Sequence, residues 1–263
     1  MVAGRIADAA EALVAPLSPT AARQAAVLDD QAHRPWPVPE GPWLMGQTWL
    51  DLAFLHWPVD PAVLRPAVPS TLPLDEHDGA AWIGVTPFEI LGLRLHGAPP
   101  LPGLSRFGET NVRTYVTVDG KPGIYFLSLD AARAAAVQAA RRSYRLPYFH
   151  AAITIAREDG GIHYRLRRDD ATQLTVDYRP TGPPQPPAPG SLAYFLTERD
   201  CLYTLDEELR PLRADIHHPR WPLQPADAEI TANTMLASYG ITLEGAPIVH
   251  FSARQDVVIW SLG

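Results

Sequence analysis

Two periodicities divide the chain into a short helical part and a long β-rich part. Apolar residues recur at helical spacing over 5–17, and a Ser-Pro pair then offers an N-cap and a first-turn proline for a second helix over 18–28. From residue 47 onward, short runs rich in β-branched and aromatic residues alternate with glycine and proline turns. We therefore expect an N-terminal helical extension with a proline-rich connector over 1–40 and a β-rich domain over 41–263.

The β-rich part contains many candidate strands and few candidate helices. The expected strands are 47–57, 80–89, 111–118, 124–130, 149–157, 162–168, 173–179, 200–205, 210–217 and 247–261. Helices are expected at 131–144, which is rich in alanine and arginine, and at 225–239, which begins at a proline and ends before a glycine. This pattern favours a mainly β, α+β fold built on an antiparallel sheet or barrel.

The composition narrows the class of protein. The chain has 22 basic and 29 acidic residues and a net charge of -7, which argues against a nucleic-acid partner. Its single cysteine, Cys201, cannot form an intrachain disulfide, and this favours a reducing compartment. No apolar run approaches the roughly 18 to 20 residues that span a bilayer. We expect a cytoplasmic protein with no membrane partner.

Lysine is almost absent from the chain. Lys121 is one of the 22 basic residues, and the other 21 are arginines. Chemistry that needs a lysine amine must therefore use Lys121 or be absent. Because Lys121 lies between glycine and proline in an expected hairpin turn, its amine should be solvated.

Several blocks of the β-rich part occur in the order found in one known family. They include Phe54-Leu55-His56-Trp57-Pro58, Ala81-Trp82-Ile83-Gly84-Val85, Asn111-Val112-Arg113-Thr114-Tyr115, Leu146-Pro147-Tyr148-Phe149-His150 and Ile216-His217-His218. Together they resemble the YqjF-like family, DUF2071, over about residues 45–262. That family looks like a distant branch of the acetoacetate decarboxylase-like superfamily. The resemblance implies a β-rich barrel or cone with peripheral helices around a buried pocket, and it implies no particular activity.

One departure from the superfamily bears on mechanism. In the decarboxylases, the segment after a similarly placed helix carries a pair of lysines, one of which forms a Schiff base with the substrate ketone. Here Tyr148 and Phe149 fall where those lysines would stand. Because a Schiff base needs a primary amine, the resemblance implies a decarboxylase-like scaffold without the decarboxylase nucleophile.

Two groups of residues could carry chemistry. Alternate positions of one strand place Glu109, Asn111, Arg113 and Tyr115 on one face, where Arg113 could bind a carboxylate. The alternative is a Glu-Arg pair that only organises the structure.

Tyr148 and His150 form the second group, because they are two apart at the start of a strand and suit proton transfer beside a carbonyl. The alternative for His150 is a core histidine bonded to a backbone carbonyl. Ser128 and His217 complete the candidate ligand-binding set. Since His217 and His218 are adjacent on a strand, at most one of them can readily face a shared pocket. No metal-ligand spacing and no phosphate-binding glycine motif occurs, so we expect neither a metal nor a nucleotide cofactor.

These observations predict a small-molecule pocket protein. If it is an enzyme, we expect acid-base or lyase-type chemistry on an oxo or carboxylate compound, with Glu109, Arg113, Tyr148 and His150 as catalytic candidates. The alternative is a non-catalytic protein that binds or senses a small, anionic ligand. A third class, an interaction protein that uses its N-terminal helices, and homo-oligomerisation both stay open.

Overall fold

The computed structural model describes residues 2–14, 18–100, 103 and 105–263. Its helices are α1 (Val2–Val14), α2 (Pro19–Ala26), α3 (Pro61–Leu64), α4 (Ala134–Tyr144) and α5 (Leu192–Thr197). Its strands are β1 (Met45–Val59), β2 (Ala81–Leu95), β3 (Arg106–Val118), β4 (Lys121–Ala131), β5 (Tyr148–His150), β6 (Ala152–Glu158), β7 (Gly161–Arg167), β8 (Gln173–Pro180), β9 (Cys201–Leu205), β10 (Pro211–His217), β11 (Gln224–Asn233) and β12 (Ile248–Ile259).

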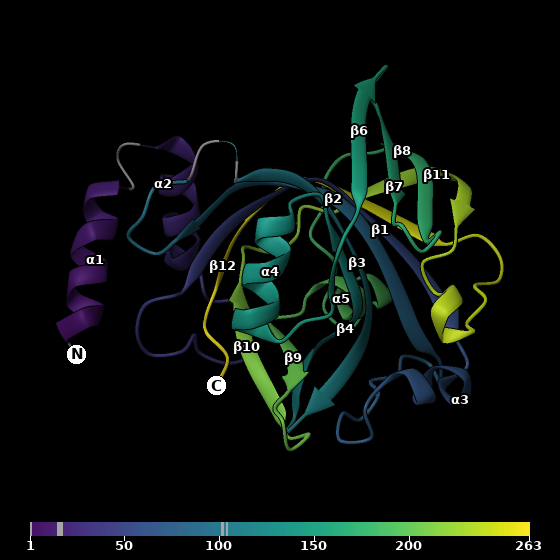
Figure 1. Cartoon of the computed structure of the whole chain (residues 1–263), viewed down its shortest axis with the longest axis horizontal. Coiled ribbons are helices and arrows are strands. Elements are labelled where there is room, and N and C mark those ends of the chain that lie inside the picture. The colour runs from purple at the N-terminus through teal and green to yellow at the C-terminus, as the bar shows by residue number, and fades with distance from the viewer. Residues whose placement is uncertain (1, 15–17, 101–102, 104) are drawn as a thin grey trace.

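A ring of strands forms the centre of the molecule. The order β1-β2-β3-β4-β9-β10-β12 closes on itself because β12 also pairs with β1. We call this ring the barrel. Figure 1 shows its long strands arching together, with α4 drawn in front of them and α5 behind. The tightest connection is the β3–β4 hairpin, where Asp119 and Gly120 both have positive φ, as a two-residue turn of type I′ requires.

A second sheet packs against one side of the barrel. It continues from β12 through β11, β8, β7 and β6, and it stands apart at the upper right of Figure 1. Outward residues of the barrel, such as Val85 and Val112, share one apolar cluster with Tyr164 and Val176 of this sheet. Alternate residues of β2 and β3 therefore face either this core or the barrel interior.

The barrel interior is lined by aromatic and apolar side chains and is covered by α4. Phe126 of β4, Ile216 of β10 and Val257 of β12 form a cluster with Tyr144 of α4. Val137, also on α4, belongs to the neighbouring cluster around Phe88 and Trp221. The apolar face of α4 therefore packs onto residues that face into the barrel.

The N-terminal extension is attached to the barrel by buried polar contacts. Arg94 of β2 donates from Nη1 and Nη2 to the two carboxylate oxygens of Glu11 on α1, both at 2.7 Å. Arg34, in the connector, forms ion pairs with Asp200 at 3.1 Å and with Asp215 at 3.2 Å. These pairs fix both ends of the extension to the body of the protein.

The structure confirms the mainly β fold and corrects one helix. Residues 225–239 were expected to be helical, but Gln224–Asn233 forms β11, followed by a 3-10 turn at Ala237–Tyr239. In β11, Ala226, Ala228 and Ile230 pack against the core between the sheets and follow a period of two. The expected helix over 131–144 is present as α4, and the end of the expected first helix, 15–17, lies outside the described residues. None of the helices in the described ranges is long and apolar enough to cross a membrane.

Candidate functional site in the barrel interior

Strand β3 presents four polar side chains to the barrel interior. Glu109, Asn111, Arg113 and Tyr115 occupy alternate positions, and all four are buried. The register places Phe88, Thr86 and Gly84 of β2 beside the first three, in that order, and Trp82 shares a cluster with Tyr115. On the other side lie Ala131, Leu129, Phe126 and Ile124 of β4. The interior surface of this wall is therefore polar along β3 and mostly apolar on both flanks.

Arg113 is a buried guanidinium without a carboxylate partner. Its side chain is 5% exposed, and Nη2 donates to the carbonyl oxygen of Leu196 on α5 at 3.1 Å. Its Cζ atom lies 5.1 Å from the centre of the Phe54 ring and 5.8 Å from that of Tyr115. Among the residues that the structure describes, Arg113 forms no ion pair, and its Nε is buried without a hydrogen-bond partner. A buried cation in this state strongly favours an anion beside it.

His56 and Tyr115 form a hydrogen-bonded pair next to Arg113. The Tyr115 hydroxyl donates to the Leu196 carbonyl at 2.8 Å and lies 2.7 Å from Nε2 of His56. Because the phenolic hydrogen goes to Leu196, Nε2 of His56 is the protonated nitrogen and Nδ1 is left as an acceptor. Burial lowers the pKa of His56 well below its usual value, and the charge of Arg113 lowers it further. His56 is therefore a neutral imidazole, and its buried Nδ1 has no hydrogen-bond partner among the described residues.

Gly84 leaves the space that the side chains of His56 and Arg113 occupy. A Cβ atom at position 84 would lie 3.0 Å from ring atoms of His56 and 3.3 Å from Cγ of Arg113. Position 84 stands between these two side chains in the register. A glycine here lets the imidazole and the guanidinium stem approach each other across β2.

Glu109 and Tyr148 form a second polar group farther along β3. The Tyr148 hydroxyl lies 3.3 Å from Oε2 and 3.4 Å from Oε1 of Glu109. Burial raises the pKa of Glu109 to about 8, although the hydrogen bond from Tyr148 acts to lower it. Glu109 is therefore largely protonated at neutral pH and can donate a proton.

Asn111 lies between the two polar groups. Thr86 donates from its hydroxyl to the side-chain oxygen of Asn111, which fixes the amide in place. Positions 109 and 113 are about 13 Å apart along an extended strand. A ligand that contacts both Arg113 and Glu109 must therefore pass Asn111.

Trp49 of β1 and Trp221, which follows β10, add two indole rings to the interior aromatic group. The Trp221 ring meets Phe54 edge-on at 4.8 Å between centroids and stacks on Trp49 at 5.9 Å. In the part of the chain that the structure describes, Nε1 of Trp221 is buried without a hydrogen-bond partner. Both Arg113 and Trp221 thus contact the Phe54 ring, and each has an N–H group free to donate to a ligand.

The structure corrects the placement of Ser128. An irregularity in the β3–β4 register falls at Leu127, because Val112 pairs with Ser128 whereas Arg113 pairs with Phe126. Val112 belongs to the core between the sheets, so Ser128 shares that face and not the face of Arg113. A β-bulge reverses which alternate residues point inward, and a strict period of two cannot foresee it.

The structure also corrects the placement of His217. Its Nε2 lies 2.8 Å from the carbonyl oxygen of Val27, and its Nδ1 lies 3.4 Å from Nη1 of Arg34. It therefore belongs to the contact with the N-terminal extension. The neighbouring His218 packs on Trp221, at 5.1 Å between ring centres, and contacts Gln255. The two histidines do face opposite sides, but His218 is the residue beside the interior aromatic group.

His150 shares the register level of Glu109 but lies at the surface. It pairs with Ala131, the partner of Glu109, and its side chain is exposed. Tyr148 is thus joined to Glu109, whereas His150 lies away from the buried polar group. Neither His56 nor Trp221 is among the site residues predicted from the sequence, and of the two adjacent histidines the prediction names His217. His56 could have been found from the sequence, because it is two residues from Phe54 in an expected strand and therefore lies on the same face.

A further histidine group lies where the connector meets the barrel. Side-chain ligand atoms of His33, Asp200 and His217 lie within 4.8 Å of one another. However, Nη1 of Arg34 lies 3.1 Å from Asp200 and 3.4 Å from His217, so a guanidinium already satisfies these acceptors. We interpret this group as a structural contact of the connector.

The strands that build this interior fall within a known sequence family. The DUF2071 family model, described as an uncharacterized conserved protein, matches residues 46–256. The chain belongs to the DUF2071 family. A DUF2071 relative, the uncharacterized protein YqjF of Bacillus subtilis (strain 168), is 46% identical over 228 residues, which cover 86% of this chain and 94% of YqjF.

Solved structures resemble the DUF2071 chain at low sequence identity. The enduracididine biosynthesis enzyme MppR, in complex with pyruvate, has a TM-score of 0.58 at 14% identity and covers 88% of this chain and 92% of its own. An acetoacetate decarboxylase from Legionella pneumophila has a TM-score of 0.56 at 13% identity and covers 89% of this chain and 94% of its own. The fold of this DUF2071 protein is therefore that of the acetoacetate decarboxylase-like proteins.

Proposed function

We propose that this protein binds a small organic carboxylate in the barrel interior, with Arg113 as the anion-binding residue. The observation that carries the proposal is the buried guanidinium of Arg113, which forms no ion pair within the described residues and keeps an unpartnered Nε. A carboxylate could accept from Nε of Arg113 and from Nε1 of Trp221, because both side chains contact Phe54. Such a ligand would supply the missing counter-charge.

The second part of the proposal gives Glu109 the role of proton donor. A carboxylic acid with a pKa of about 8 is mostly protonated at neutral pH. In that form Glu109 can donate to a carbonyl oxygen of a bound oxo acid, and the Tyr148 hydroxyl can stabilise the carboxylate that remains. The proposed chemistry is therefore acid-base catalysis on an oxo acid long enough to reach from Arg113, which holds its carboxylate, past Asn111 to Glu109. Glu109 protonates the carbonyl oxygen, and a solvent water accepts the proton lost from the carbon next to that carbonyl. His150 takes no part in it, since its side chain is exposed.

The proposal excludes a Schiff base with lysine. Lys121 begins β4 next to the hairpin turn, and its Nζ lies 5.8 Å from the ring centre of Trp36 in the connector. Tyr148 occupies the place in the interior where the superfamily resemblance implied a lysine. The MppR structures with pyruvate, and with a condensation product of pyruvate, support the idea that this fold can hold an oxo acid.

A non-catalytic binding protein is the competing function. It would use Arg113 and Trp221 in the same way, but Glu109 would serve only to fix Tyr148. The two functions differ in one measurement, because only the enzyme exchanges a substrate proton for a solvent proton. Proton NMR in D₂O of a longer oxo acid, such as 5-oxohexanoate, would show faster loss of the signals next to its carbonyl with the protein than with its Glu109→Gln variant, because Glu109 protonates the carbonyl oxygen while solvent removes the neighbouring proton.

Binding itself is tested by calorimetry with pyruvate and a panel of small oxo and hydroxy acids. Arg113→Met should remove binding of any acid that the unmodified protein binds. Arg106→Met is the matched control, because Arg106 lies on the same strand but is exposed and paired with Glu89 at 2.8 Å. Mass spectrometry of molecules that co-purify with the protein extends the panel. The proposal fails if Arg113→Met binds the same acids with unchanged affinity.

A further inference from the structure

The wall of the barrel is interrupted beside β4. Ile124 and Tyr125 of β4 pair with β9, and Leu129 to Ala131 pair with β5. Within the described chain, residues 126–128 have no strand partner on that side. The segment 145–147, which follows α4, lies at the interruption: Pro147 accepts from the amide of Leu129 at 3.0 Å, and Arg145 accepts through its carbonyl oxygen from the Thr204 hydroxyl at 3.1 Å.

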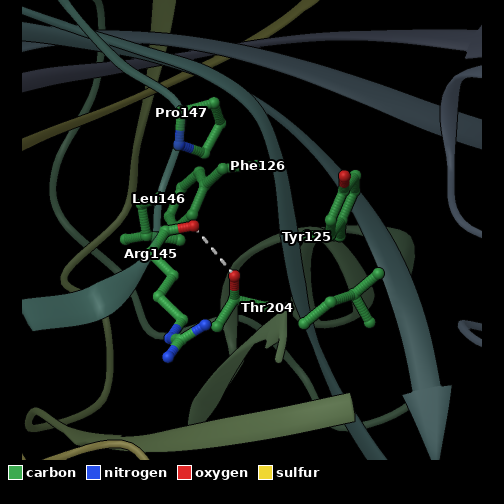
Figure 2. A pocket seen from close by; sticks show the side chains of 7 residues that line it. Tyr125, Phe126, Arg145, Leu146, Pro147 and Thr204 are labelled. Atoms are coloured by element: carbon green, nitrogen blue, oxygen red, sulfur yellow. Dashed lines mark hydrogen bonds between the residues drawn. The ribbon is translucent and has the colours of Figure 1, made fainter. Parts of the chain in front are cut away.

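A pocket of about 280 Å³ lies at this interruption. Figure 2 shows Arg145, Leu146 and Pro147 on one side of it, Thr204 below and Tyr125 opposite, with the bond between Thr204 and the Arg145 carbonyl dashed. Phe126 and Leu205 complete the lining. The pocket is near the lower end of the range for small-ligand sites, and small organic acids are among the smallest ligands.

Phe126 connects this pocket to the proposed ligand site. It lines the pocket, and it is also the register partner of Arg113, on the same face of the barrel wall. Its side chain is buried and belongs to the interior cluster that contains Leu146. Phe126 and Leu146 therefore lie between the pocket and the interior. Phe126 is directly across the strand pair from Arg113.

Arg145 brings positive charge to the pocket in a costly conformation. It ends α4 with φ of 52° and ψ of 31°, the left-handed conformation in which glycine is the usual residue. Its ion pair with Glu207 is loose, at 3.4 Å, and both side chains are well exposed. Such a pair contributes little to stability, so the guanidinium is available to a passing anion. Arg141 and Arg142, in the last turn of α4, add to the positive charge at this end of the helix.

We propose that this pocket is the entrance through which an anionic ligand reaches the barrel interior. Arg145 attracts the anion, and Leu146 and Phe126 move aside to admit it. The inference rests on the proposed function for the kind of ligand, a small anion. The route itself follows from the interrupted wall, the pocket and the position of Phe126.

The test uses a cysteine introduced inside the barrel, so that it needs no ligand of known identity. Asn111→Cys is made in a Cys201→Ala background, and modification of the introduced thiol is timed with two thiol reagents. The anionic probe is sulfonatoethyl methanethiosulfonate and the neutral probe is methyl methanethiosulfonate. In each case the thiolate attacks the sulfenyl sulfur, a disulfide forms and methanesulfinate leaves.

Two substitutions at Arg145 isolate its charge. We expect Arg145→Glu to slow the anionic reagent about tenfold and to leave the neutral reagent unchanged. Arg145→Gly should also slow the anionic reagent, while its melting temperature stays the same or rises because glycine relieves the left-handed conformation. Arg210→Glu is the control, since Arg210 is exposed on the β9–β10 turn and not in the pocket lining.

Substitutions at Leu146 test the route. Leu146→Ala should speed both reagents, because it removes part of the barrier, and Leu146→Trp should slow both. Equal rates for the anionic reagent in the Arg145→Glu protein and its parent would overturn the role of Arg145. The entrance would be overturned if the thiol introduced by Asn111→Cys never reacts, or reacts at the same rate with alanine, leucine or tryptophan at position 146. These outcomes are independent of whether Arg113 binds a carboxylate, which the calorimetry decides.

Discussion

Tyr148 and Glu109 come from different strands and meet in the barrel interior, where the Tyr148 hydroxyl lies 3.3 Å from Oε2 of Glu109. Burial outweighs this hydrogen bond and raises the pKa of Glu109 from 4.5 to about 8. The same burial raises the pKa of Tyr148 well above its usual value, with the charge of Glu109 adding to the effect. Both groups of this pair therefore keep their protons at neutral pH.

The raised pKa of Glu109 predicts a loss of stability as the pH increases. Between pH 4.5, near the unfolded pKa, and about 8, the folded state binds more protons than the unfolded state. The free energy of unfolding should therefore fall across this window relative to that of Glu109→Gln, which cannot ionise. Urea unfolding of both proteins at pH 5, 6.5 and 8.5 measures the difference.

Glu89 provides a control, because its pKa is shifted in the direction opposite to that of Glu109. Although burial acts to raise its pKa, hydrogen bonds from Arg106 and Arg157 lower it overall. The stability that Glu89 contributes is present above its unfolded pKa and is lost as the pH falls through the lowered value. Glu89→Gln should therefore leave the slope between pH 5 and 8.5 unchanged. An equal slope for the unmodified protein and Glu109→Gln would show that Glu109 is ionised throughout.

Two buried arginines should respond in opposite ways to substitution by methionine. Arg168 donates to both carboxylate oxygens of Asp130, which is fully buried, so Arg168→Met leaves an unpaired buried carboxylate and should cost about 3 to 5 kcal/mol. Arg113→Met removes a buried charge that has no carboxylate partner in the described structure, and should leave stability unchanged or increase it. Chemical denaturation compares the two. Destabilisation of the Arg113 variant as large as that of the Arg168 variant would indicate a structural role for Arg113.

Borohydride reduction in the presence of an oxo acid should trap no adduct. The only primary amine on a side chain is that of Lys121, which belongs to the strand end at the β3–β4 turn. Intact-mass spectrometry after treatment with pyruvate and borohydride should therefore show the unmodified mass. An adduct at Lys121, absent from Lys121→Arg, would restore Schiff-base chemistry to this protein.

The contact between Glu11 and Arg94 should hold α1 on the barrel. The Arg94 side chain is fully buried and Glu11 is its carboxylate partner, so Glu11→Ala should cost about 3 kcal/mol. The same change should cost much less in an Arg94→Met background, where no buried charge is left unpaired. A double-mutant cycle by urea unfolding gives the coupling free energy. A coupling near zero would mean that α1 is held by its other contacts.

The sequence predicted the class of fold because most strands show a clear local pattern. It failed at β11, where Ala226, Ala228 and Glu229 are good helix formers and where pairing with β8 determines the structure. The face shared by Glu109, Asn111, Arg113 and Tyr115 could be predicted, since β3 is regular there. That Arg113 would be unpaired could not, because its neighbours Phe54 and Leu196 come from distant segments.

Site residues near irregular backbone were the hardest to place. Ser128 follows the bulge at Leu127, and this single extra residue moves it to the outer face. The sequence predicts that His217 and His218 face opposite sides of a strand, but it does not predict which of the two faces the interior. The side of the strand on which His217 lies is covered by the N-terminal extension, through Val27, His33 and Arg34.

The pairing of β1 with β12 makes the barrel a product of the whole chain. The first strand of the ring finds its second neighbour only in the last, from Met45 with Ile259 to His56 with Ile248. During synthesis, one edge of β1 therefore stays unpaired until β12 has left the ribosome. Contacts this distant in sequence slow folding. In the meantime the exposed edge can pair with another chain and cause aggregation. We therefore expect newly made molecules of this protein to need chaperones, although the folded protein has a closed barrel.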